Sequence, residues 1–280
     1  MKIVVTGARG QLGHALKEQS KYTPGIDIYF ADSTEADITD KASLQDIFKR
    51  LKPQYCINAA AYTAVDKAES EPQKAHAINV LGAKNLAEVC LEHECVLLHI
   101  STDFVFNGTK RTPYTEDDAP NPQSVYGITK LQGEAEVQKV LKQYFIVRTS
   151  WVYSEYGNNF MKTMLRLASE RDALNVVDDQ VGTPTNANDL AVALFKITQA
   201  KSTAYGIYNY SNEGQTTWYG FAKKIFEVNN VKINLQPIAT SAYPTPAKRP
   251  AYSVLDKTKI KKEFGITIPN WEDTVKNERS

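Results

Sequence analysis

The chain has 280 residues, of which 42% are hydrophobic and 23% are charged, and its formal net charge is +1. A chain of this length can form a substantial core in one large domain or in two coupled ones. Because no block of like charge interrupts the sequence, there is no electrostatic argument for nucleic acid or a membrane as partner. We therefore expect a small-molecule partner.

The N-terminus lacks the pattern of a secretory leader. Its apolar run ends at Thr6-Gly7, and nowhere do about 18 apolar residues follow one another. The three cysteines, Cys56, Cys90 and Cys95, include no CxxC pair, which fits a reducing compartment without disulfides. Both features predict a cytoplasmic protein.

The first predicted strand, residues 2–6, is followed directly by Gly7-x-x-Gly10-x-x-Gly13 and then by a helical pattern. Glycines at such a turn let the backbone approach a pyrophosphate, which free N–H groups and the positive end of the helix hold. The spacing differs from the Gly-x-Gly-x-x-Gly of many dehydrogenases. Its place directly after a strand nevertheless favours a dinucleotide site over a purely structural turn.

The second predicted strand, residues 26–30, ends beside Asp32, close to the expected distance of about 20 residues beyond the glycine turn. A carboxylate at this place accepts hydrogen bonds from an adenosine ribose and repels a 2′-phosphate, which favours NADH over NADPH. Arg9 in the glycine loop would offset that repulsion, so the preference between the two cofactors stays open.

Asp37 and Ile38 come before a helix expected over residues 44–51. They have two interpretations, a contact to the adenine or, for Asp37, a cap for a helix from Ser43 to Arg50. The next predicted strand, residues 55–58, leads into the small residues of Ala59-Ala-Ala-Tyr-Thr63. Small side chains at a strand end would let a flat ligand lie close to the backbone.

One long helix is expected from Pro72 to Glu94. Asn79 inside this helix either satisfies a neighbouring backbone group or has a functional role. Asp66 and Glu69, in the charged stretch before it, belong either to a solvated face or to a site.

The strand predicted at residues 96–100 ends in Ser101-Thr102-Asp103. Ligands gather at the carboxyl ends of strands in an open parallel sheet, so the Thr102 hydroxyl is placed to polarise a reacting carbonyl. An irregular, proline-containing stretch of about twenty residues follows, and a connection of that length in a compact domain is usually functional.

A helix predicted to begin at Ser124 places Tyr126 and Lys130 four residues apart, on one face. The ordinary pKa of a phenol is about 10, but a neighbouring ammonium stabilises the phenolate and lowers that pKa. Tyr126 would then exchange a proton near neutral pH. An isolated Tyr-x-x-x-Lys is more often an exposed pair on a helix, so the interpretation depends on the other motifs.

Four motifs occur together: Thr6-Gly7-x-x-Gly10-x-x-Gly13, Asn58-Ala-Ala-Ala61, Ser101-Thr102-Asp103 and Tyr126-x-x-x-Lys130. In combination they resemble the extended short-chain dehydrogenase/reductases that act on nucleotide sugars. Further stretches in both halves of the chain are residues 60–69, 101–106, 148–153, 157–160, 179–185, 216–219 and 247–250. These resemble one family within that superfamily, the dTDP-4-dehydrorhamnose reductases.

This resemblance implies an α/β fold with a Rossmann-type doubly wound parallel sheet and a smaller C-terminal substrate-binding lobe. Residues 1–150 would form the dinucleotide-binding Rossmann domain, and residues 151–280 mainly the lobe, with some segments returning to the Rossmann domain. Helices are expected at 159–171, 188–198 and 218–228, and strands at 174–177 and 206–210. No linker marks the boundary between the two parts.

The resemblance also implies an activity: reduction of the C4 ketone of dTDP-4-dehydro-6-deoxy-L-mannose to dTDP-L-rhamnose, for cell-surface polysaccharide, with NADPH or NADH as cofactor. Tyr126 would donate a proton as hydride arrives from the nicotinamide. Lys130 would hold the nicotinamide ribose and lower the pKa of Tyr126, while Thr102 would hydrogen-bond the developing alkoxide. The hydride chemistry belongs to the cofactor.

The resemblance assigns two groups of binding residues. The cofactor-binding group is Gly7, Arg9, Gly10, Gln11, Leu12, Asp32, Asp37, Ile38, Ala61, Tyr62, Thr63, Tyr126 and Lys130. The substrate-binding group is Thr102, Asp103, Tyr126, Trp151 and Asn159.

Trp151 would pack on the apolar face of a deoxysugar, with a core or interface tryptophan as the alternative. The roles of Asn158, Lys162, Gln180, Thr183 and Arg249, which lie in matching motifs, are not readable from the sequence. Arg249 could equally cap a helix or pair with a surface acid.

Some members of the resembled family are described as dimers bridged by Mg²⁺ through glutamates. At those places this chain has His14-Ala15 and the stretch 186–189, where Asp189 is the one acid. We therefore expect a monomer or a weak homodimer and no metal. A zinc site at residues 90–99 is not expected either, because its ligands would straddle a helix end and a strand.

Two alternatives remain beside a reductase. The first is another nucleotide-sugar epimerase or dehydratase, although a dehydratase usually carries a glutamate after its Thr-Asp pair, where this chain has Phe104. The second is a non-catalytic NADP-binding regulatory subunit like that of methionine adenosyltransferase. The presence of Thr102, Tyr126, Lys130 and Trp151 favours an active reductase.

Overall fold

The computed structural model describes residues 1–276. Its centre is a six-stranded parallel sheet of order β10-β5-β4-β3-β1-β2. The strands are β1 (Lys2–Thr6), β2 (Asp27–Ala31), β3 (Tyr55–Asn58), β4 (Val96–Thr102), β5 (Tyr144–Thr149) and β10 (Gly206–Asn209). The predicted α/β fold with a doubly wound parallel sheet is confirmed.

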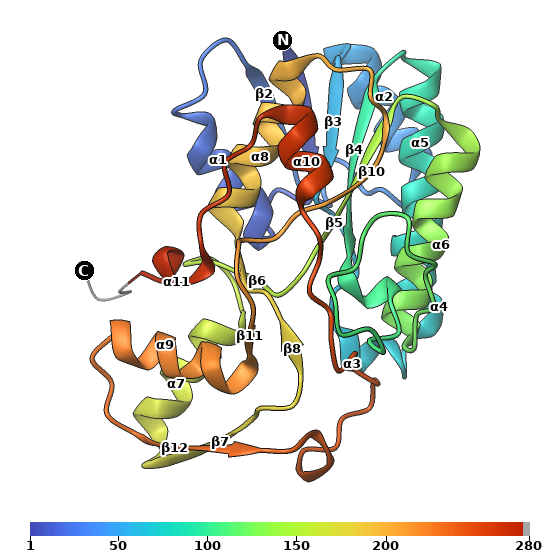
Figure 1. The fold of residues 1–280 in the computed structure, drawn as a ribbon. Coiled ribbons are helices and arrows are strands. Elements are labelled where there is room, and N and C mark those ends of the chain that lie inside the picture. Colours follow the sequence, from blue (N-terminus) through green and yellow to red (C-terminus); the bar gives the residue numbers. More distant parts are fainter. Residues whose placement is uncertain (277–280) are drawn as a thin grey trace.

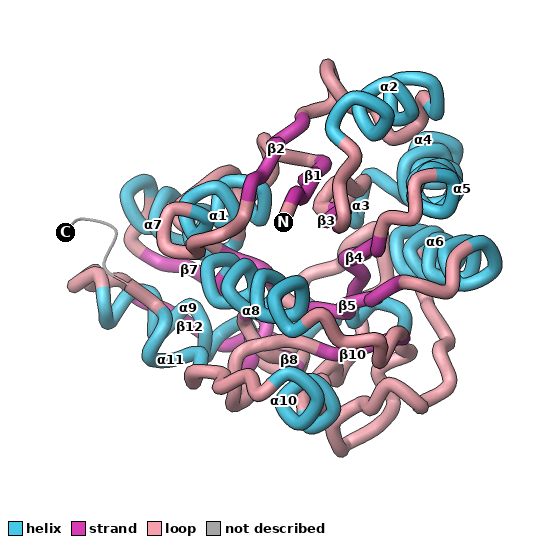
Figure 2. Tube along the Cα trace, turned by 90° about the horizontal axis from the view of Figure 1, so that it is seen from above, coloured by secondary structure: helices cyan, strands magenta, loops and turns pink. Residues whose placement is uncertain are grey.

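Helices cover both faces of this sheet (Figure 1 and Figure 2). One face carries α1 (Gln11–Ser20), α8 (Ala187–Ala200) and α10 (Thr258–Phe264), and the other carries α2 (Lys41–Leu51), α5 (Gly82–Glu92) and α6 (Val125–Val140). Strands buried on both sides need apolar residues at successive positions. In β1, Ile3 and Val5 enter the core under α1 and α8, while Val4 enters the core under α2 and α5.

The chain reverses its direction across the sheet at β1, because β2 lies on one side of β1 and β3 on the other. In doubly wound sheets the crevice outside the carboxyl ends of such strands is the usual ligand site. Gly7, at the end of β1, has φ +73°, and an added Cβ would lie 2.6 Å from the backbone nitrogen of Ala60. Glycine is required here, because the turns after β1 and β3 meet without a side chain between them.

A second lobe lies below the carboxyl edge of the sheet in the view of Figure 1. It contains α7 (Phe160–Glu170), α9 (Trp218–Val228) and the parallel pair β7 (Ala173–Val177) and β12 (Asn234–Ile238), which share an apolar core. The short elements β6 (Val152–Tyr153), β8 (Val181–Gly182), β9 (Thr185–Asn186), β11 (Thr216–Thr217) and α11 (Trp271–Thr274) surround it. The division at residue 150 stays a prediction, and α8, β10 and α10 lie along the sheet although they follow that residue.

Two local predictions are corrected. The cap of α2 is Asp40, which accepts from the Ala42 N–H (3.0 Å), so the interpretation of Asp37 as that cap is wrong. Asp37 instead accepts from the Thr39 N–H (2.9 Å) in its own turn. The helix expected over 72–94 is divided into α4 (Pro72–His76), a π-helical turn at Ala77–Leu81 and α5. A π turn adds a residue to the helical repeat and commonly occurs at functional sites.

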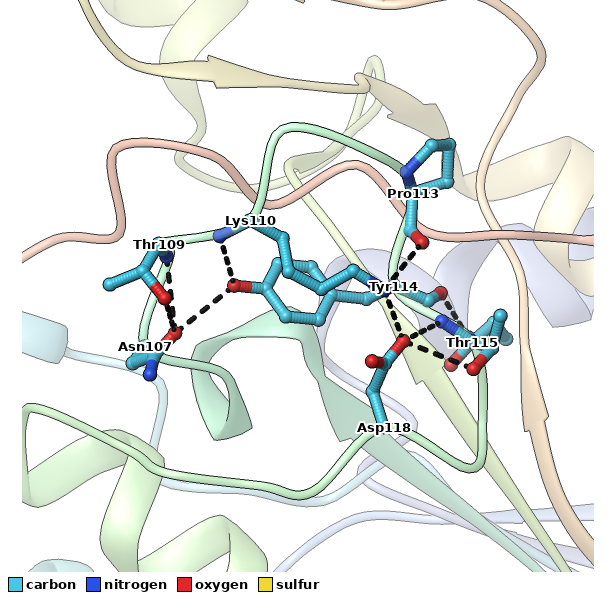
Figure 3. Close-up of polar contacts among 8 residues, drawn as sticks. Asn107, Thr109, Lys110, Pro113, Tyr114, Thr115 and Asp118 are labelled. Atoms are coloured by element: carbon cyan, nitrogen blue, oxygen red, sulfur yellow. Dashed lines mark hydrogen bonds and ion pairs between the residues drawn. The ribbon is translucent and has the colours of Figure 1, made fainter.

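The long connection between β4 and α6 is held by internal hydrogen bonds (Figure 3). The Tyr114 hydroxyl donates to Asn107 Oδ1 (3.1 Å) and accepts from the Lys110 N–H (3.2 Å). Asp118 accepts from Lys110 Nζ at 2.7 Å. Tyr114 also forms a β-bridge with Leu255, so this connection is fixed against the C-terminal part of the chain. Within residues 1–276, none of the helices has the combined length and hydropathy that crossing a bilayer requires.

Candidate active site

The predicted cofactor and catalytic residues lie on segments that leave the carboxyl ends of β1, β2, β3 and β4, or on α6. The helix α1 begins in this crevice with Gly10 as its N-cap, and no side chain caps it. Its first turn contains no acidic residue. An added Cβ at Gly13 would lie 2.5 Å from the Gly7 carbonyl oxygen, so the glycines allow the turn to close tightly. The uncapped N–H groups form a site suited to a phosphate.

Arg9 and Asp32, the two groups expected to decide between NADH and NADPH, form an ion pair at 2.5 Å. Asp32 Oδ1 also accepts from the Thr34 N–H (2.7 Å) and hydroxyl (2.6 Å). These hydrogen bonds, with a smaller contribution from Arg9, lower the pKa of Asp32. The Arg9 side chain is 72% exposed, so it can meet a further anion while Asp32 is ionised.

Asn79 fixes the segment after β3. Its Oδ1 accepts from the Tyr62 N–H (2.8 Å), and its Nδ2 donates to the Tyr62 carbonyl (3.2 Å) and to Thr129 Oγ1 (3.1 Å). Of the two interpretations of Asn79, satisfaction of a neighbouring backbone group is confirmed. Because Thr129 lies on α6, Asn79 also ties the predicted cofactor segment Ala61–Thr63 to the helix that carries Tyr126.

A buried polar chain at the same edge was not predicted. Asn58 accepts from the Thr6 hydroxyl (2.8 Å) and the Ala60 N–H (3.1 Å), and its Nδ2 lies 3.0 Å from His99 Nδ1. Burial, with a smaller effect of the Lys130 charge, holds the pKa of His99 well below its usual range. A neutral His99 therefore accepts a hydrogen bond from Asn58. The hydrogen bonds of Asn58 fix the turn after β3, which faces Gly7.

Thr102, Asp103 and Tyr126 lie together where β4 ends. The Thr102 hydroxyl donates to Asp103 Oδ1 (3.0 Å) and accepts from the Phe104 N–H (3.2 Å). Asp103 is 1% exposed, and its burial raises the pKa of the carboxyl to about 6. Burial also raises the pKa of Tyr126 to about 12, although a hydrogen bond with the Thr102 side chain lowers it in part. Tyr126 is thus a protonated phenol at neutral pH.

Lys130 follows Tyr126 by one helical turn and is 2% exposed. Its ammonium donates to the Ile100 carbonyl at 2.7 Å. Burial lowers the pKa of Lys130 to about 8, against the raising effect of the Glu134 carboxylate. In this structure the ammonium is directed to β4 and burial dominates the pKa of the Tyr126 phenol. That Lys130 lowers the pKa of Tyr126 when the cofactor is bound stays a prediction.

Trp151 lies where β5 passes into the lobe, with φ +45°. Its ring stacks on Trp218, with the ring centroids 3.6 Å apart and the planes 11° from parallel. Trp218 Nε1 donates to Gln180 Oε1 at 3.2 Å. Trp218 was not among the predicted site residues, although it lies in the motif 216–219. Stacking on Trp218 shows that Trp151 is an interface residue of the lobe, and a contact to substrate stays a prediction.

A cavity of about 820 Å³ opens beside the Trp218 ring. Its walls include Asp66, Phe160, Gln180, Trp218, Tyr243 and Arg249. The Arg249 guanidinium pairs with Asp66 through bonds of 2.7 and 3.0 Å, so the interpretation of Arg249 as the partner of an acid is confirmed. Hydrogen bonding by Arg249 lowers the pKa of Asp66. The cavity thus combines aromatic walls with two cations, Arg171 and the paired Arg249.

Asn159 was predicted to bind the substrate and Gln11 to bind the cofactor, and their side chains contact each other. Asn159 caps α7 by accepting from the Lys162 N–H (3.1 Å), and its Nδ2 donates to Gln11 Oε1 (3.0 Å) and to the Ser154 carbonyl (2.6 Å). The amide of Asn159 therefore joins the glycine loop to the lobe. Thr183 is fully buried, and its hydroxyl donates to the Gly214 carbonyl (2.8 Å).

No group of three or more His, Cys, Asp or Glu side chains within residues 1–276 is arranged to hold a metal ion. Cys56, Cys90 and Cys95 are buried free thiols. Asp189, the one acid of the stretch 186–189, accepts from Asn212 Nδ2 at 2.7 Å.

Comparison with known proteins identifies the family. The family model described as "RmlD substrate binding domain" matches residues 1–278. A dTDP-4-dehydrorhamnose reductase of Aggregatibacter actinomycetemcomitans is 43% identical over 290 residues, which cover 100% of this chain and 98% of that protein. This chain belongs to the dTDP-4-dehydrorhamnose reductase family. The resemblance found in the sequence motifs is confirmed.

Solved members of the dTDP-4-dehydrorhamnose reductase family have the same fold. One, from Bacillus anthracis in complex with NADP, has a TM-score of 0.94 at 40% identity and covers 98% of this chain and 96% of that one. Another, from Clostridium acetobutylicum, has a TM-score of 0.94 at 41% identity and covers 99% of this chain and 97% of that one.

Proposed function

We propose that this chain is an NAD(P)H-dependent oxidoreductase that reduces the C4 ketone of dTDP-4-dehydro-6-deoxy-L-mannose to dTDP-L-rhamnose, a step of polysaccharide biosynthesis. Family membership supports the substrate. The observation that carries the chemistry is the protonated Tyr126 beside the Thr102 hydroxyl, at the edge where α1 presents free N–H groups. Reduction of a ketone consumes a proton, and a phenol that is protonated at neutral pH has one to supply.

The residues of the crevice fit a dinucleotide. The N–H groups of α1 would hold the pyrophosphate, and Asp32 would accept from the adenosine ribose. Arg9, largely exposed beside Asp32, would meet a 2′-phosphate, which makes NADPH as well as NADH acceptable. Asp37, Ile38 and the segment Ala61–Thr63 would border the adenine and the adjacent ribose. When bound, the reduced nicotinamide supplies the hydride.

Three side chains would serve the reacting carbonyl. Thr102 would donate a hydrogen bond to its oxygen, and Tyr126 would transfer the phenolic proton to that oxygen as the alcohol forms. Lys130 would turn from the Ile100 carbonyl to the ribose hydroxyls of the cofactor, and its charge would stabilise the phenolate left after proton transfer.

The nucleotide-sugar substrate would extend from Tyr126 past Trp151 into the cavity beside Trp218. The aromatic stack offers an apolar surface to a deoxysugar, and Arg249 offers a cation to the diphosphate. Asp103 and Asn159 would support this surface. We propose a cytoplasmic enzyme that works as a monomer or a weak homodimer, with no nucleic acid or membrane as partner.

A coupled assay tests this function. The substrate is made from dTDP-glucose by the upstream dehydratase and epimerase, and oxidation of NADPH and NADH is followed separately by absorbance. Oxidation that depends on this protein and yields dTDP-rhamnose supports the proposal and ranks the cofactors. If the folded protein binds the cofactors but oxidises neither NADPH nor NADH, the substrate is another nucleotide sugar or the protein has the non-catalytic regulatory role.

A further inference from the structure

The buried ion pair between Glu134 and Arg148 has no part in the chemistry described so far. Glu134 lies one helical turn after Lys130 on α6, and its exposed fraction is 0%. Its carboxylate accepts from Arg148 Nε (3.0 Å) and Nη2 (2.7 Å) and from the Ser101 hydroxyl (2.5 Å). Three donors on one buried carboxylate fix its position tightly.

The partners of Glu134 belong to the two strands that end at the proposed reaction centre. Ser101 of β4 and Arg148 of β5 are paired in register, directly before Thr102. The residue before Ser101 is Ile100, whose carbonyl accepts from Lys130 Nζ. Glu134 therefore sets the spacing between α6, which carries Tyr126 and Lys130, and the strand end that carries Thr102.

Stability alone is a weak reason for this pair. Removing two charges from water costs several kcal/mol per ion, and well-packed apolar residues of similar volume are often equal or better for stability. The surrounding core offers such packing, since the Arg148 guanidinium lies over the Phe106 ring at 5.2 Å. A buried pair one turn from an ionisable lysine points to a role in the site.

Ionisable groups lie on α6 and on the strands that pack against it near Lys130. Tyr126 and Glu134 lie on α6 itself, His99 on β4, Asp103 directly after β4, and Arg148 on β5. His99 is neutral, and the phenol of Tyr126 is protonated near pH 7. Glu134 is the carboxylate that opposes the effect of burial on the lysine.

We propose that Glu134, held by Arg148 and Ser101, is a positioning residue that keeps Lys130 charged and aligned with Tyr126. This inference rests on the role given to Lys130 in the proposed function. Its test therefore uses the wild-type chain as reference: activity in the wild type establishes the reductase, and only the variants report on Glu134.

The first variant is Glu134→Gln, with Glu136→Gln on the same helix as the matched control, because Glu136 has no bond to Arg148 or Lys130. Without the Glu134 carboxylate, Lys130 loses its proton at lower pH. We expect the alkaline limb of the kcat profile to move down by about one pH unit, so that kcat at pH 8 falls about fivefold. The NADPH dissociation constant should rise as well, while the control keeps the wild-type profile.

The second variant, Glu134→Met/Arg148→Met, separates positioning from folding, because an apolar pair can replace a buried ion pair without loss of stability. A folded double variant with a lowered alkaline limb supports the proposal. A folded double variant with the wild-type kcat and pH profile would overturn it. If neither variant folds, as judged by circular dichroism and the thermal midpoint, the pair is a folding element and the positioning role is rejected.

Discussion

The two sides of the proposed site are built differently. On the sheet side, Thr102, Tyr126 and Lys130 come from one strand end and one helix, and buried hydrogen bonds fix them. On the lobe side, Trp151, Trp218 and Arg249 come from segments far apart in the chain, and ring stacking and one partly exposed ion pair hold them. We infer that the sheet side determines the rate of the chemical step and the lobe side the affinity for substrate.

The strongest test of this comparison is Tyr126→Phe. Because the phenol is the proposed proton donor, we expect kcat to fall at least about a hundredfold while NADPH still binds. The matched control is Tyr22→Phe, since Tyr22 is 74% exposed and follows the C-terminal end of α1, whereas the N-terminal end of α1 lies in the crevice. Near-normal turnover of Tyr126→Phe in the coupled assay would remove Tyr126 from the mechanism.

On the lobe side, Trp218→Leu keeps apolar bulk but removes the ring on which Trp151 stacks. An aromatic pair contributes about 1 kcal/mol beyond its buried area. We expect KM for the nucleotide sugar to rise about five- to tenfold with kcat within about twofold of the wild type. Steady-state kinetics check this split, and a loss confined to kcat would contradict the division between the two sides.

Asp103 allows a test of the sheet side by pH. Its pKa of about 6 in the folded protein lies above the ordinary 3.8, so folding takes up a proton between these values. The ionised form therefore costs stability near pH 7, and this cost is relieved as the pH falls through 6. Between pH 7 and pH 5, the wild type should gain about 1 kcal/mol in unfolding free energy relative to Asp103→Asn. Urea unfolding of both proteins at both pH values measures the gain. If the unfolding free energies of the wild type and Asp103→Asn change equally between pH 7 and pH 5, Asp103 is not desolvated.

The smallest effect is expected from Asp66→Asn. The Asp66 and Arg249 side chains are 40% and 24% exposed, and exposed ion pairs contribute about 0.2–1 kcal/mol. We expect less than about 1 kcal/mol of stability to be lost and KM to change less than about threefold. Unfolding curves and KM at low and high salt check this. A loss of stability as large as that expected from breaking a buried ion pair would mean that the lobe side is as rigidly fixed as the sheet side.

The sheet side was predictable from the sequence because its signals are local. A strand followed by glycines and a helix, and a Tyr and a Lys four residues apart, can be read within short windows. Ser124 and Asn159 were expected at the starts of their helices and cap them. The family could be read from motifs in both halves of the chain.

The features that could not be predicted from the sequence depend on contacts between distant parts of the chain. The pairing of β12 with β7, the stacking of Trp151 on Trp218 and the choice of Asp66 as the partner of Arg249 each join segments far apart in the sequence. The raised pKa of Tyr126 was missed for a related reason. Residue spacing shows which groups are neighbours, but the pKa depends on burial, which only the folded protein determines.

The position of β10 has a consequence for synthesis of the protein. β10 is the outer neighbour of β5 in the sheet, but residues 150–205, which include α7 and α8, lie between the two strands in the chain. While the ribosome makes this segment, the backbone N–H and C=O groups along one side of β5 have no partner strand. The nascent chain would then be exposed to edge-to-edge aggregation until β10 emerges, and slowed elongation in this region should increase the demand for chaperones.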